Sequence, residues 1–141
     1  MRTLLALGLL AAVLGTATAD DKNPTAGKWV IESVTRDGKA DDDLKGAVRV
    51  HAGDKYTVTP AAGAKTPAVS GTFAADAGKT PATIDMKPAS GRYKDKTLLG
   101  IYKLDGDALT VAFAEPGKDR PTGFDSKPGG GVVVAVHKRA K

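Results

Sequence analysis

Cysteine is absent from this chain of 141 residues, and histidine is scarce, with two copies. Without cysteine the chain cannot form a disulfide, a thiol nucleophile or a zinc–thiolate site. The two histidines, His51 and His137, have no companion ligand at a suitable spacing, and strand alternation predicts that both face outward. The sequence therefore predicts no metal and no cofactor.

Aromatic residues make up only 5% of the chain, and no run of them has the spacing of a base-stacking surface. The net charge is +5, but the basic residues are scattered among Asp and Glu. A nucleic-acid-binding domain would gather its Lys and Arg on one face or in one block. We therefore expect no nucleic-acid partner, and the sequence identifies no protein partner.

The one long apolar run lies at the N-terminus, in "MRTLLALGLLAAVLGTATA". A positive charge at Arg2, the apolar run Leu4 to Leu14 and small residues up to Ala19 are typical of a secretory signal peptide. A retained membrane helix is the alternative, but the run is shorter than the roughly 20 residues that a span needs. We expect cleavage near Ala19, export to the periplasm or the medium, and no stable membrane insertion afterwards.

Apolar and polar residues alternate along the rest of the chain in short runs broken by Gly, Pro and Asp. Eight such runs predict an all-β fold, a single eight-stranded antiparallel up-and-down barrel, with a two-sheet sandwich as the alternative. The segment "KADDDLKG", residues 39–46, predicts one short helix after the first strand. We expect a signal peptide over 1–19, a flexible segment over 20–26 and the barrel domain over 27–141.

The same alternation predicts which side chains point into the barrel. The expected ligand-binding residues of the interior are Trp29, Ile31, Tyr56, Phe73, Leu109 and Phe113. Further inward positions are Val50, Ile84, Val111 and Val134.

The opening strand begins with "GKW", Gly27 to Trp29, and the last strand ends with a basic residue, Arg139. This pair resembles the lipocalin signature, in which a cation lies across the tryptophan and closes one end of the barrel. More of the chain, above all Thr97 to Lys138 with "LLGIY", "LDGD" and "FAEPGKDRP", resembles a lipocalin-like domain of unknown function from planctomycetes. That resemblance implies an exported lipocalin-like barrel and carries no catalytic residue and no ligand. The stretch "AAGAKTPA" departs from the family pattern.

The longest connection, "AEPGKDRPTGFDSKPGGG", is rich in Gly, Pro and charge. Lys118 and Arg120 beside Gly117 could contact an anion, whereas the neighbouring acidic residues favour an ordered structural lid. We expect Phe124, the one large apolar residue of the loop, to pack onto the barrel.

No catalytic constellation is present, since Ser70, Ser90 and Ser126 lie in no nucleophile elbow, and we expect the chain not to be an enzyme. Two functions remain open. One is the binding of a small apolar ligand inside the barrel, and the other is a non-catalytic structural or interaction module of the cell envelope with a filled barrel.

Overall fold

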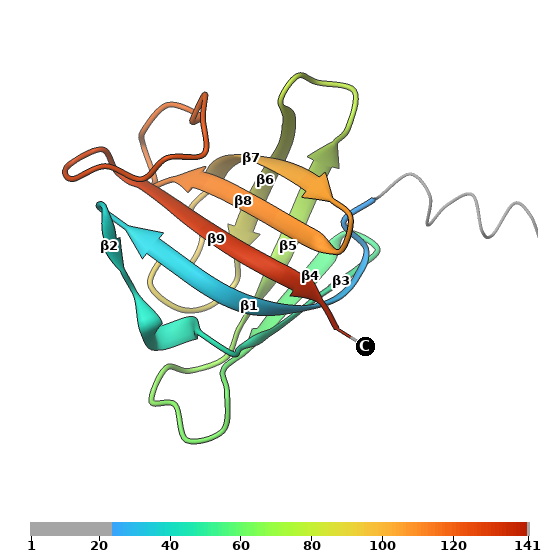
Figure 1. The fold of residues 1–141 in the computed structure, drawn as a ribbon, viewed down its shortest axis with the longest axis vertical. Helices are drawn as coiled ribbons and strands as arrows, with labels where there is room; N and C mark the ends of the chain where they lie inside the picture. The colour runs from blue at the N-terminus through green and yellow to red at the C-terminus, as the bar shows by residue number, and fades with distance from the viewer. Residues whose placement is uncertain (1–23, 141) are drawn as a thin grey trace, which may run out of the picture.

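Eight antiparallel strands close into a barrel in the computed structural model, which describes residues 24–140 (Figure 1). Each strand pairs with its neighbour in the chain, and β1 also pairs with β9, which closes the sheet. The wall is built from β1 (Gly27–Arg36), β3 (Val48–Ala52), β4 (Lys55–Thr59), β5 (Val69–Asp76), β6 (Ala82–Pro88), β7 (Leu98–Asp105), β8 (Ala108–Ala114) and β9 (Val132–Arg139). The predicted barrel is confirmed, and the sandwich is ruled out. The predicted signal peptide, 1–19, lies outside the described residues.

The predicted short helix is wrong. Its residues form a two-residue strand, β2 (Lys39–Ala40), paired with the end of β1, and a single 3-10 turn, η1 (Asp42–Leu44). The Asp41 carboxylate accepts a hydrogen bond from the Asp43 backbone N–H, which caps the turn. A segment this short cannot offset the cost of nucleating an α-helix, so the chain pairs its first residues with β1 instead.

The two ends of the barrel differ in their connections. At one end tight turns join β3 to β4 and β7 to β8, with Gly53 and Gly106 at positive φ. At the other end lie the longer connections from β1 to β3, β4 to β5, β6 to β7 and β8 to β9. Trp29 is fully buried at the tight-turn end, beside Arg139 of β9. We call the tight-turn end, which holds Trp29, the plugged end, and the opposite end the loop end.

The inner face of β3 differs from the predicted one. Val50, expected inside, is only half-buried, while its neighbours Arg49 and His51 are buried in the interior. The cause is the register of the β3–β4 hairpin, in which His51 lies opposite Tyr56 and Arg49 opposite Val58. Opposed residues share a face, so the inward side chains of β4 carry Arg49 and His51 inward with them.

The face of β9 is also opposite to the predicted one. Val133, Ala135 and His137 point into the barrel, and Val134 packs on its outside with Ile101 and Ala112. Both faces of this strand are apolar and covered, so alternation in "VVVAVHK" gives no signal for which face is inner. His137, expected to be outward, is fully buried.

The long loop over residues 115–131 lies along the outer wall rather than across the end of the barrel. Phe124 packs onto the outer cluster of Ile101, Ala112 and Val134, as the sequence predicted, and the Lys103 ammonium lies 4.7 Å from its ring centroid. The Ser126 hydroxyl accepts a hydrogen bond from the Gly38 backbone N–H and donates one to the Val132 carbonyl. The loop is therefore a strap on the wall, and the predicted lid is not formed.

Residues before Gly27 also pack into the barrel. Thr25 is fully buried, and its carbonyl accepts a hydrogen bond from the Trp29 indole at 2.9 Å. The C-terminal part of the segment predicted to be flexible, 20–26, is thus packed into the plugged end. Among residues 24–140 no helix is long and apolar enough to cross a membrane.

Candidate functional site

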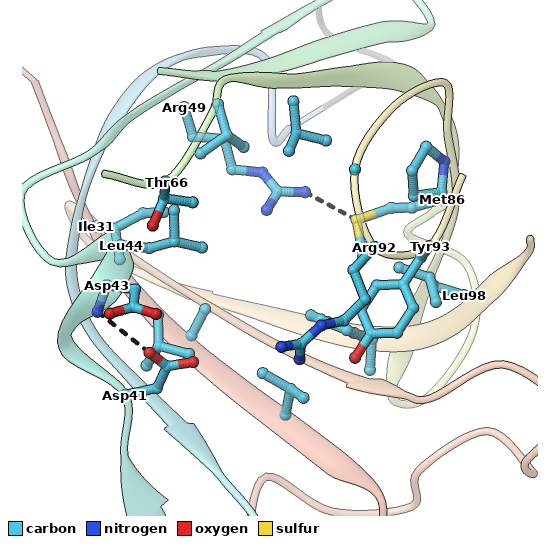
Figure 2. A pocket seen from close by; sticks show the side chains of 18 of the residues that line it. Ile31, Asp41, Asp43, Leu44, Arg49, Thr66, Met86, Arg92, Tyr93 and Leu98 are labelled. Atoms are coloured by element: carbon cyan, nitrogen blue, oxygen red, sulfur yellow. Dashed lines mark hydrogen bonds between the residues drawn. The ribbon is translucent and has the colours of Figure 1, made fainter. Parts of the chain in front are cut away.

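A cavity of about 270 Å³ occupies the loop end of the barrel, beneath η1 and the connections from β4 to β5 and from β6 to β7 (Figure 2). Its wall is mainly apolar and includes Ile31, Val34, Val58, Leu98, Val133 and Ala135. The half of the barrel nearer the plugged end is filled by its own side chains, including Trp29, Phe73, Ile84 and Leu109. The interior is therefore hollow at one end and packed at the other.

Arg49 lies where the hollow and the packed halves meet, with its side chain directed into the cavity (Figure 2). It is 6% exposed. Its Nε donates to His51 Nε2 at 2.8 Å, its Nη2 donates to Met86 Sδ at 2.8 Å, and its Cζ lies 5.0 Å from the centroid of Tyr56. All three partners are uncharged groups.

The positive charge of Arg49 has no acidic partner. Among residues 24–140, no carboxylate forms an ion pair with Arg49, and no residue accepts a hydrogen bond from its Nη1. Burial lowers the pKa of Arg49 to about 10, which leaves the guanidinium protonated at neutral pH. Burying an ion costs several kcal/mol even after relaxation, and buried charges are ordinarily paired. The cavity thus holds an unpaired cation.

His51 links the guanidinium to the plugged end. Because its Nε2 accepts from Arg49, its proton is on Nδ1, which donates to the Thr25 hydroxyl at 2.9 Å. Its ring lies 4.3 Å from that of Phe73, centroid to centroid. Burial, with the nearby charge of Arg49, lowers the pKa of His51 to about 2, so the ring is neutral. It orients Arg49 without neutralising it.

A second imidazole, that of His137, is buried deeper in the packed half. Its Nδ1 donates to the Leu109 carbonyl at 3.0 Å, and its Nε2 has no partner among the described residues. Burial and the charge of Arg49 lower the pKa of His137 to about 3. The Tyr102 hydroxyl is also buried without a described partner. Neither residue lines the cavity.

Charged residues also surround the mouth of the cavity. Arg36 donates to Asp41 at 3.1 Å and to the Tyr93 hydroxyl at 2.9 Å, which ties the end of β1 to the β6–β7 connection. Asp43 and Arg92 complete this ring. The formal charges of the two arginines and the two aspartates cancel at the mouth.

The structure brings together only part of the predicted interior site. Ile31, Tyr56 and Phe113 line the cavity. Trp29, Phe73 and Leu109 point inward but belong to the packed half. The Arg139 guanidinium lies 4.2 Å from the centroid of the Trp29 indole, across the plugged end.

The anion contact predicted in the loop has a different setting. Arg120 lies on the outer wall, where its Nη1 forms an ion pair with Asp85 and donates to the Gly100 carbonyl. Lys118 is exposed, and its side chain runs over Gly131. Neither residue lines the cavity, so they do not form a site together with the barrel interior.

Sequence reasoning missed Arg49, Met86 and Tyr93 as lining residues. A signal for Arg49 was present, because Tyr56 and the tight turn at Gly53 together fix the hairpin register and so the inner face of β3. Tyr93 lies in an irregular connection, for which alternation has no information. No group of three or more metal-ligating side chains occurs within residues 24–140.

No family model matches the chain, and neither the curated proteins nor the solved structures compared with it include a match.

Proposed function

We propose that this chain is a lipocalin-like barrel that binds a small, largely apolar ligand in the cavity at its loop end. The observation that carries the proposal is the volume of about 270 Å³ bounded by apolar side chains inside a closed barrel. Pockets for drug-sized ligands have volumes of roughly 300–1,000 Å³, so the expected ligand is small. With the predicted signal peptide over 1–19, binding would take place outside the cytoplasm.

A second function is a structural or interaction module of the cell envelope with no ligand. The packed half of the barrel favours it, because Trp29, Phe73, Ile84 and Leu109 fill that interior themselves. The two functions differ in what they require of the hollow half: a binding protein needs the space, whereas a scaffold does not.

Filling the cavity separates the two functions. Ala135 is an inward residue of β9 that lines the cavity, and Ala135→Leu adds an apolar side chain there. Ala74→Leu is the matched control, since Ala74 is exposed on the outer face of β5. Calorimetric titration with octanol, a neutral apolar probe, should show binding to the native chain and to the control, and at least tenfold weaker binding to Ala135→Leu.

Native mass spectrometry of the protein purified from its own host provides an independent test. A small molecule that copurifies with the native chain and is lost from Ala135→Leu supports a binding function. No copurifying molecule, together with no octanol binding, would favour the scaffold.

A further inference from the structure

The cavity has an electrostatic character that its apolar wall does not explain. Five charged residues line it, and the four at the mouth, Arg36, Asp41, Asp43 and Arg92, cancel in formal charge. Arg49 is the fifth and lies at the inner end (Figure 2). The net positive charge of the cavity therefore resides on one buried guanidinium.

The donors of that guanidinium are only partly used. A guanidinium carries five N–H groups, and in Arg49 His51 accepts one of them and Met86 accepts another. Both N–H groups of Nη1 remain without an acceptor among residues 24–140. The Nη1 and Nη2 edge of a guanidinium is a planar fork that matches the two oxygens of a carboxylate.

The guanidinium is also held in place before any ligand arrives. His51 fixes Nε, Met86 fixes Nη2, and the ring of Tyr56 packs against the group at 5.0 Å. His51 is in turn held by Thr25 at the plugged end. A donor whose position is fixed by its neighbours loses little entropy on binding, which favours recognition of a head group of matching shape.

We propose that the cavity binds an anionic amphiphile, a small monocarboxylate whose head group pairs with Arg49 and whose apolar tail fills the space towards the mouth. This inference rests on the proposed function and names the chemical class of its ligand. Recognition depends on the charge of Arg49 and on its unused Nη1 donors, and the apolar wall supplies affinity that does not depend on the head group.

Three probes with the same tail and different heads test the inference: octanoate, octanol and octylammonium, each titrated calorimetrically at neutral pH. Hydrogen bonds to a charged group correspond to roughly a 10- to 150-fold change in affinity. We expect octanoate to bind the native chain more tightly than octanol by a factor in that range, and octylammonium to bind most weakly.

Arg49→Met removes the charge and keeps an apolar side chain of similar reach. It should lose the preference for octanoate over octanol. Arg120→Met is the matched control, because Arg120 is paired with Asp85 on the outer wall, and it should keep the preference. If Arg49→Met does not fold, Arg49→Lys, which keeps the charge but not the fork, should show a reduced preference.

The outcomes are distinct for the two proposals. Equal binding of octanoate and octanol to the native chain, or a preference for octylammonium, would overturn the anionic ligand and leave the binding cavity standing. A preference for octanoate that survives in Arg49→Met would also overturn it. No binding of any probe would overturn the proposed function, and this inference with it.

Discussion

Arg49 and His51 are joined inside the barrel by a hydrogen bond of 2.8 Å that runs from the guanidinium Nε to the imidazole Nε2. A positively charged donor facing Nε2 is compatible only with a neutral ring that carries its proton on Nδ1. The pair therefore keeps its net charge of one at neutral pH, on the arginine. The hydrogen bond connects the packed half of the barrel with the cavity and presents the charge of Arg49 to that cavity.

Acid should destabilise the protein through its two histidines. Burial and the charge of Arg49 lower the pKa of His51 to about 2 and the pKa of His137 to about 3, against an ordinary value of 6.5. Between about pH 6.5 and pH 3 the unfolded chain therefore binds protons that the folded chain does not. The free energy of unfolding decreases as the pH is lowered through that window. Each histidine contributes about 1.4 kcal/mol per pH unit.

Urea unfolding at neutral pH and at about pH 5 measures this effect, with the carboxylates contributing a common background. His137→Gln removes one of the two titrating groups. Its free energy of unfolding should fall less steeply with acid than that of the native chain, by up to about 1.4 kcal/mol per pH unit. Identical slopes for the two proteins would show that His137 is not a buried neutral imidazole.

The plug at the closed end should be a major contributor to stability. Trp29 is fully buried, and Trp29→Ala is expected to cost roughly 3 to 5 kcal/mol as a large-to-small core substitution. Arg139→Met removes the cation over the indole and should cost only about 0.5 to 2 kcal/mol. Denaturant unfolding measures both, and a negligible loss for Trp29→Ala would contradict the role of the tryptophan as a plug.

Loosening the strap over residues 115–131 should not change ligand binding in the cavity. Phe124→Ala removes the side chain that packs on Ile101, Ala112 and Val134, and it should expose the loop to limited proteolysis. Octanol affinity should stay unchanged, since no residue of the loop lines the cavity. Thr122→Ala, at an exposed position of the same loop, is the control for proteolysis. Loss of octanol binding in a folded Phe124→Ala protein would link the strap to the site.

Much of the barrel is predictable because its strands alternate and its hairpins are short. The positions of Trp29, Tyr56, Ile84 and Val111 follow from alternation alone, and the structure places all four inside. The residues that give the cavity its chemistry do not follow in this way. Arg49 escapes prediction because valines flank it, and alternation assigns valines to the core unless the register is worked out across the turn.

His137 illustrates the same point. Arg139, two residues further along the strand, lies over the Trp29 indole, and residues two apart on a strand share a face. The predicted contact between Arg139 and Trp29 therefore already implies that His137 points inward, contrary to the outward position predicted from strand alternation. By contrast, the path of the loop along the outer wall depends on packing between distant residues, which local pattern does not encode.

The ionisation of a bound carboxylate tests the central claim most directly. Octanoate carrying an isotope label at its carboxyl carbon can be followed by NMR, bound and free, as the pH is lowered from about 8 through the ordinary carboxyl range near about 4. Beside Arg49 the bound head group should stay ionised at pH values at which free octanoate takes up its proton, with a pKa below that of the free acid. An apolar cavity with no cation beside the carboxylate would raise that pKa. A bound carboxyl that takes up its proton at higher pH than the free acid would therefore contradict the account.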